Sequence, residues 1–163
     1  MKKFLFLALA GSMLVSCTTV ESGHEAPIIS YGGETDMTQT LGEGIHWGIG
    51  YLWNDTPEYL IRNTTITVTD KYFDMNDMET PVTVTVYFNP IKGKTNLLHK
   101  NVGPDYLDTK LKPIIQGALA KVIPQYSAQN LNKVSRAEAE KKIKELLLKE
   151  TPGIYIEVSN VQF

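Results

Sequence analysis

The residue with the most distinctive chemistry is Cys17, the only cysteine in a chain of 163 residues. It follows a start that carries Lys2 and Lys3 and an apolar run of 12 residues over 4–15. A charged start, a short apolar stretch and small residues before a cysteine are typical of a secretory signal. We therefore expect residues 1–16 to be a cleavable signal peptide.

Residues 14–17, Leu-Val-Ser-Cys, resemble the bacterial lipobox, at which the signal is cleaved and the cysteine becomes a thioether to diacylglycerol. The resemblance predicts lipidation (palmitate and related acyl chains) at Cys17 and a chain held in the bacterial cell envelope, facing the periplasm or the exterior. An ordinary signal with a chance cysteine, or an uncleaved anchor, is the alternative. A spanning helix needs about 20 apolar residues, whereas two acyl chains are enough for stable anchoring.

Other residues that could do chemistry are scattered along the chain. His24, His46 and His99 are far apart, and none lies four residues from another metal-ligating side chain, so no metal site is expected. No nucleophile-elbow or phosphate-loop spacing occurs, and the glycines over 42–50 do not match the dinucleotide fingerprint. We therefore expect a protein that is not an enzyme and has no cofactor.

Two clusters of charge have simple explanations. Asp74, Asp77 and Glu79 lack the ligand spacing of a calcium-binding loop and are expected to be a solvated loop. Lysines and glutamates alternate over 135–150, which is typical of an exposed, salt-bridged helix face. Nothing in this pattern indicates nucleic-acid binding.

The charge of the chain is unevenly distributed. Residues 18–90 carry 2 basic and 11 acidic side chains, whereas residues 91–163 carry 12 basic and 7 acidic ones. Copies of such a chain could stack head to tail by charge complementarity. The alternative is that the strand-rich and helix-rich halves simply have different surfaces.

The first half of the mature chain is predicted to be strands. Residues 17–27 are polar without periodicity and are expected to be a flexible lipid tether, which leaves 28–163 as one domain. The glycine-rich stretch 27–56 predicts short strands and turns. Residues 59–69 and 82–88 have the composition and alternation of two strands joined by a loop.

The second half is predicted to be mainly helical. Apolar residues recur at three- and four-residue spacing over 107–122, and a capping-box pattern at Ser135 and Glu138 starts a helix that ends near Glu150. Residues 154–163 alternate as a last strand. The order of strands, two main helices and a strand predicts an α+β fold, with an antiparallel or mixed sheet and the helices on one face.

Trp47, Tyr51 and Trp53 cluster in the glycine-rich stretch near the expected lipid anchor. Amphipathic aromatic side chains there could rest among lipid headgroups, or they could fill the core beneath the sheet. Both interpretations are consistent with the sequence.

Several motifs, in this order, resemble those of the SPFH or Band 7 domain of prohibitins, stomatins and flotillins. They are Gly-Glu-Gly-Ile-His-Trp over 42–47, Thr-Asp at 69–70 with the strand over 82–88, the helix over 111–128, and the strands over 153–158 and 161–163. The resemblance covers residues 28–163. It implies a non-enzymatic membrane scaffold that oligomerises and organises or regulates membrane proteins, including proteases.

Departures from the family pattern are also present. Gly48-Ile49-Gly50 stands where family members usually carry a proline, and Arg136 and Glu138 are out of register with the usual Arg-Glu pair. The family continues into a long coiled coil that supports its ring or cage assemblies, and this sequence ends at Phe163. Lateral association through the domain alone is compatible with the sequence, and whether large closed cages form stays open. The alternative function is a small lipid-anchored binding module or inhibitor of an envelope protein.

Overall fold

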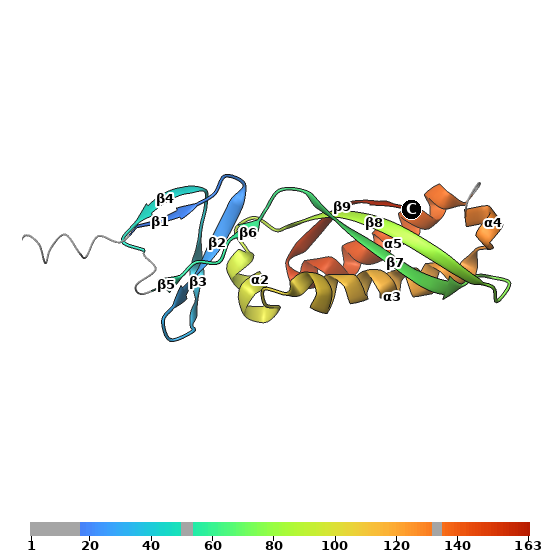
Figure 1. The fold of residues 1–163 in the computed structure, drawn as a ribbon, viewed down its shortest axis with the longest axis horizontal. Helices are drawn as coiled ribbons and strands as arrows, with labels where there is room; N and C mark the ends of the chain where they lie inside the picture. The colour runs from blue at the N-terminus through green and yellow to red at the C-terminus, as the bar shows by residue number, and fades with distance from the viewer. Residues whose placement is uncertain (1–16, 50–53, 132–134) are drawn as a thin grey trace, which may run out of the picture.

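The computed structural model describes residues 17–49, 54–131 and 135–163. The molecule is elongated, with a group of short strands at one end and a helix-covered sheet along the rest (Figure 1). We call residues 17–60 the N-terminal unit and residues 64–163 the helix–sheet unit. The predicted signal peptide, residues 1–16, lies outside the described residues.

The N-terminal unit consists of short antiparallel strands. One sheet pairs β1 with β4, and a second has the order β3-β2-β5, while β6 pairs with the start of β2. The strands are β1 (Cys17–Val20), β2 (His24–Ser30), β3 (Thr35–Leu41), β4 (Gly44–Trp47), β5 (Asn54–Asp55) and β6 (Tyr59–Leu60).

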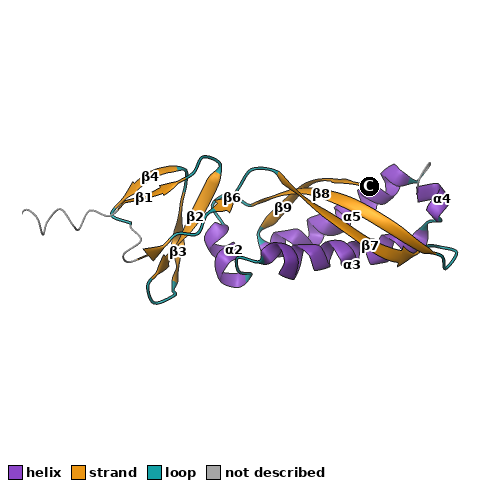
Figure 2. Ribbon diagram, viewed as in Figure 1, coloured by secondary structure: helices purple, strands orange, loops and turns teal. Residues whose placement is uncertain are grey.

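The helix–sheet unit is an antiparallel sheet of order β7-β8-β9 with two main helices packed on it (Figure 2). Its strands are β7 (Thr64–Phe73), β8 (Glu79–Pro90) and β9 (Ile156–Gln162). Its helices are α2 (Thr95–Asn101), α3 (Lys112–Val122), α4 (Ala128–Leu131) and α5 (Arg136–Glu150). A π-helical turn at Leu107–Leu111 precedes α3, and 3₁₀ turns occupy Ile123–Gln125 and Thr151–Ile154.

Alternation along β8 explains this packing. Val82, Val84, Val86 and Phe88 are buried, since successive side chains of a strand point to opposite faces. On the other face, Thr85 and its neighbours form hydroxyl pairs with β7, such as Thr67–Thr85 at 3.2 Å. Apolar residues one turn apart on α3 and α5 complete the core: Ile115, Leu119, Ile143 and Leu147.

The predicted α+β class and the two main helices are confirmed. Residues 17–27 are not a tether in the structure, because they form β1 and the start of β2 and bury Val20 and Ala26. The expected antiparallel sheet under the two main helices is β7-β8-β9, the short strands before it form separate sheets, and the sequence pattern did not predict α2. The capping box does not form, since Ser135 makes no side-chain cap bond and Glu138 instead accepts a bond from the Tyr126 hydroxyl.

Among the described residues, we find no helix with both the length and the apolar character that crossing a membrane requires.

Candidate functional site at the Cys17 end

Cys17 is the first residue of β1, and its thiol is free and exposed. It lies directly opposite Trp47 in the antiparallel pair of β1 and β4. These two strands lie toward one end of the molecule (Figure 1). The pairing continues through Thr19 opposite Ile45. The cysteine therefore stands on a hydrogen-bonded strand, with an indole ring as its cross-strand neighbour.

The side chains next to Cys17 on β4 are apolar and open to solvent. Trp47 is 69% exposed and Ile45 is 61% exposed. The interpretation that Trp47 fills the core is therefore wrong, and Tyr51 and Trp53 lie outside the described residues. Ile45 was not recognised in the sequence as part of this surface, because a single isoleucine among glycines shows no periodicity.

The turn between β1 and β2 is held by side chains from elsewhere in the chain. One carboxylate oxygen of Glu43 accepts hydrogen bonds from the Gly23 amide (3.1 Å) and the Ser22 hydroxyl (2.9 Å). The bond from Gly23 is the main reason that the pKa of Glu43 lies below its usual value. Arg62 donates to the same hydroxyl at 3.0 Å and fills the space beside Gly23, whose φ is +82°.

A buried carboxylate joins the N-terminal unit to the helix–sheet unit. Glu25 on β2 is 3% exposed and accepts the Gly93 amide at 2.8 and 3.0 Å and the Thr95 hydroxyl at 3.3 Å. Asn96 adds a bond from its amide to the backbone oxygen of Asp36. The sequence holds no signal for this role of Glu25, because buried acids are rare and their partners are distant in the chain.

An aromatic pair reinforces the same junction. The Tyr59 hydroxyl lies 2.6 Å from Nδ1 of His99, and the two rings pack edge to face. Burial raises the pKa of Tyr59 to about 12 and lowers the pKa of His99. At neutral pH the phenol therefore keeps its proton and the imidazole is uncharged, and one hydrogen bond joins the phenol oxygen to Nδ1.

The opposite end of the molecule is the hairpin between β7 and β8. The carboxylate of Asp74, 3% exposed, accepts backbone bonds from Asn76 (2.8 Å), Met78 (3.0 Å) and Ala128 (3.0 Å). The bond from Ala128 is the largest reason that its pKa is lowered. The expectation of a purely solvated acidic loop is therefore wrong for Asp74, which fastens the hairpin to the start of α4.

This ordered hairpin displays apolar side chains. Phe73, Met75 and Met78 are 61%, 59% and 55% exposed. The backbone behind them is fixed, since the Met75 amide also donates to the Tyr126 carbonyl at 3.0 Å. The described residues thus place one exposed apolar group at each end of the long axis.

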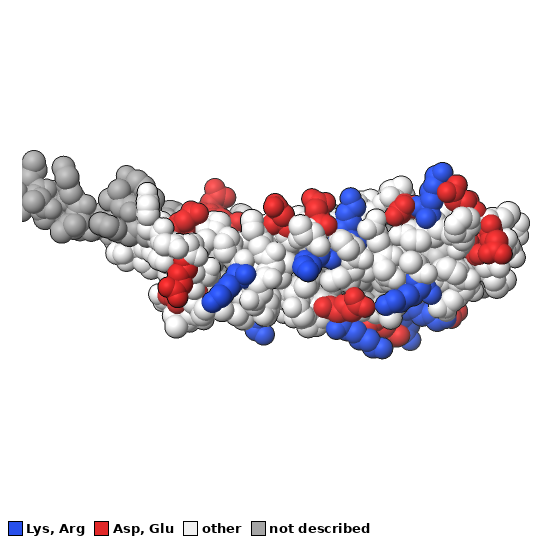
Figure 3. Space-filling view, turned by 90° about the horizontal axis from the view of Figure 1, so that it is seen from below, with Lys and Arg blue, Asp and Glu red and all other residues white. Residues whose placement is uncertain are grey.

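The uneven charge of the sequence persists in the fold: residues 17–60 carry seven acidic side chains and no lysine or arginine, whereas the helix–sheet unit carries both signs. Acidic and basic side chains are interspersed along the face in Figure 3, and acidic groups occur toward both ends. The helix–sheet unit carries both signs because β7 and β8 belong to the acidic half of the sequence but run beside α3 and α5, which belong to the basic half. Head-to-tail stacking of copies by charge complementarity stays a prediction.

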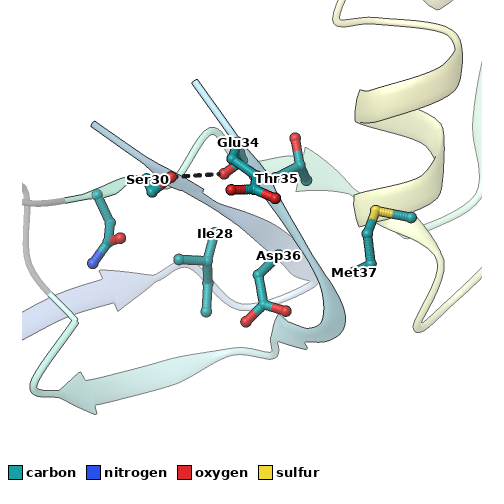
Figure 4. A pocket seen from close by; sticks show the side chains of 7 residues that line it. Ile28, Ser30, Glu34, Thr35, Asp36 and Met37 are labelled. Carbon is teal, nitrogen blue, oxygen red and sulfur yellow. Dashed lines mark hydrogen bonds between the residues drawn. The ribbon is translucent and has the colours of Figure 1, made fainter. Parts of the chain in front are cut away.

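A hollow of about 430 Å³ lies between β2 and β3 and is lined by Ile28, Ser30, Glu34, Thr35, Asp36, Met37 and Asn54 (Figure 4). The carboxylate of Asp36 has a local role, because it accepts both the amide and the hydroxyl of Thr38, and these two bonds lower its pKa. None of its lining residues is a histidine, cysteine or lysine that could act as a base or nucleophile.

The remaining histidine of interest, His46, is also engaged locally, with Nε2 2.7 Å from the Gly42 carbonyl. Across 17–49, 54–131 and 135–163 no histidine is hydrogen-bonded to the side chain of a serine, threonine or cysteine. The fold and these surfaces define an α+β domain whose prominent features are exposed apolar ends.

The family model of the SPFH domain / Band 7 family matches residues 18–163, and the chain therefore belongs to this family. Its members are generally non-enzymatic scaffolds that associate with membranes. No curated protein matches the chain.

Proposed function

We propose that this protein is a lipid-anchored SPFH scaffold, attached to the bacterial envelope through acylated Cys17. In this proposal the domain self-associates at the membrane surface and organises or regulates membrane proteins. The observation that carries it is the position of Cys17 on β1, opposite exposed Trp47 and beside exposed Ile45. An acyl chain on this strand leaves no spacer, so the apolar side chains of β4 meet the headgroup region.

Anchoring also explains how weak contacts suffice for assembly. Molecules confined to a surface have a high effective concentration, which populates lateral contacts that would be negligible in solution. The elongated domain, held at one end, presents its sides to neighbouring copies.

Replacement of Cys17 tests the anchor. We expect Cys17→Ala to remove palmitate labelling and to release the protein from the membrane fraction. The matched control is Thr19→Ala, an exposed change two residues along the same strand, which leaves labelling and membrane association unchanged. Unchanged membrane association of Cys17→Ala would contradict the lipid anchor.

Cross-linking of native membranes followed by blue-native electrophoresis tests self-association. We expect ladders of the protein with itself at native expression. Monomers alone would contradict the scaffold.

The second candidate is a lipid-anchored binding module or inhibitor of an envelope protein. The exposed apolar hairpin at Phe73, Met75 and Met78 favours it, because preorganised apolar side chains form effective binding hot spots. A pull-down distinguishes the two candidates. The binding module would be supported by one stoichiometric partner and no self-association. Phe73→Ala should lose that partner, and the exposed control Leu148→Ala should retain it.

A further inference from the structure

We propose that Glu21, His24 and Glu58 form a binding site for one divalent transition-metal ion, with Zn²⁺ as its probe. A carboxylate oxygen from each glutamate and a ring nitrogen of the histidine all lie within 4.8 Å of one another. Ligands placed about 2.1 Å from a tetrahedral ion are about 3.4 Å apart. Small rotations of the two exposed glutamate side chains are enough to close this set around an ion.

The backbone brings the three residues together. Glu21 and His24 are the ends of the tight turn between β1 and β2, which is closed by the His24 amide on the Glu21 carbonyl at 3.0 Å. Glu58 stands two residues before Leu60, which pairs with His24. Because side chains alternate along extended backbone, this spacing places Glu58 on the His24 side, while Glu25 faces the opposite way toward Gly93.

The site is electrostatically incomplete without a cation. The Glu21 and Glu58 carboxylates are close together, and no ion pair among the described residues involves either of them. Nδ1 of His24 is buried and has no hydrogen-bond partner within the described part of the chain. Like charges at short range and an unpaired buried nitrogen both cost free energy. A cation between the carboxylates relieves the first cost, and it relieves the second when Nδ1 is the ligand atom of His24.

The donor set indicates the class of ion. Imidazole suits zinc and its neighbours in the first transition row, whereas Ca²⁺ and Mg²⁺ prefer oxygen ligands alone. Three protein ligands leave a fourth position for water. The ion would clip the β1–β2 turn to the segment before β6, 37 residues away in the chain, and so stabilise the part of the molecule that carries Cys17.

Calorimetric titration of the full chain, purified in detergent and freed of metal, tests the site. We expect one Zn²⁺ per chain, and affinity reduced at least about tenfold in Glu58→Gln and in His24→Gln. Glu58→Gln is isosteric and retains an oxygen that can accept the Glu21 amide, so the fold is preserved. The matched controls Glu34→Gln and His46→Gln change the same residue types elsewhere in the N-terminal unit and should bind as the parent chain does.

Thermal unfolding supplies a second readout, since a ligand that binds only the folded chain raises its melting temperature. Zn²⁺ should raise that temperature in the parent chain and in both controls, but not in Glu58→Gln or His24→Gln. No Zn²⁺ binding, binding unaffected by both substitutions, or equally tight binding of Ca²⁺ would overturn the proposal. The measurement involves no membrane and no partner, so it is independent of the scaffold proposal.

Discussion

The two units of this molecule are stabilised in different ways. The core of the helix–sheet unit, with Tyr59 of β6 added, contains 22 buried residues among those described, whereas the separate core of the N-terminal unit contains four: Val20, Ala26, Ile28 and Leu41. Hydrophobic stabilisation grows with the apolar area buried, so a core of four residues contributes little by itself. The N-terminal unit therefore depends on its polar contacts with the helix–sheet unit.

Those contacts join β2 and β6 of the N-terminal unit to α2 and to the loop that precedes α2. Glu25 binds Gly93 and Thr95, and Tyr59 binds His99. The comparison implies a hierarchy: disruption of the helix–sheet core unfolds the whole chain, whereas disruption of the junction loosens only the N-terminal unit. The predictions below test this hierarchy.

The largest effect is expected from Leu119→Ala on α3. Leu119 is fully buried between the sheet and α5, and loss of a buried leucine costs about 2–5 kcal/mol of unfolding free energy. Urea denaturation followed by circular dichroism measures this loss. Leu148→Ala, at a position 44% exposed on α5, is the matched control and should change stability by less than about 0.5 kcal/mol.

A smaller and more local effect is expected from Glu25→Ala. The substitution leaves the Gly93 amide and the Thr95 hydroxyl without their acceptor, which costs about 1–3 kcal/mol. Hydrogen exchange should show faster exchange in β2 and β6 and unchanged protection in α3 and α5. Glu34→Ala removes an exposed acid of the same unit and serves as the control. Equal loss of protection in α3 would contradict the hierarchy.

The junction should also respond to pH through His99. Burial lowers the pKa of His99 below its ordinary value of 6.5, so the unfolded chain binds the proton more readily than the folded chain. Its contribution to stability is therefore complete above about pH 6.5 and is lost as the pH falls from 6.5 through the lowered pKa. Exchange of β6 amides, measured from pH 7.5 to 5 and divided by the intrinsic exchange rate at each pH, should accelerate over this window.

Two variants separate His99 from other titrating groups. His99→Asn should remove the acceleration below pH 6.5, whereas His46→Asn, at a histidine outside the junction, should retain it. An unchanged pH response in His99→Asn would show that a different group controls the junction.

The two units also differ in how well the sequence predicts them. Valines at alternate positions over 82–86 and apolar residues at helical spacing over 111–122 predicted β8 and α3 correctly, because each element buries one continuous face. The N-terminal unit has no such face. Its strands are short, Pro27 and charged residues interrupt the pattern, and the burial of Ala26 depends on pairing with Leu41.

The candidate site was predictable only where the chemistry is local. Lipidation at Cys17 stays a prediction that rests on the four residues of its motif. The strand partner Trp47 could not be predicted, since cross-strand pairing depends on the register of β1 and β4. Similarly, the acids at 74–79 looked alike in the sequence. Asp74 is a buried acceptor because the Ala128 amide, at the start of α4, donates a hydrogen bond to its carboxylate. Asp77 lies in the exposed turn of the same hairpin.

The smallest change in stability is expected from a substitution at one exposed end of the molecule. Trp47→Phe should change the unfolding free energy by less than about 0.5 kcal/mol, because Trp47 is 69% exposed. Its position beside Cys17 nevertheless predicts contact with lipid. In Trp53→Phe, Trp47 is the only tryptophan of the chain, and brominated lipids in reconstituted vesicles should quench its emission.

The opposite end provides the matched probe. Phe73→Trp, made together with Trp47→Phe and Trp53→Phe, places the only tryptophan at a hairpin position that is 61% exposed. If the anchored end alone rests on the membrane, brominated lipids should leave this emission unquenched, because the elongated molecule holds the hairpin away from the bilayer. Quenching at both ends would instead mean that the domain lies flat, and the hairpin would then contact lipid rather than remain free for a protein partner.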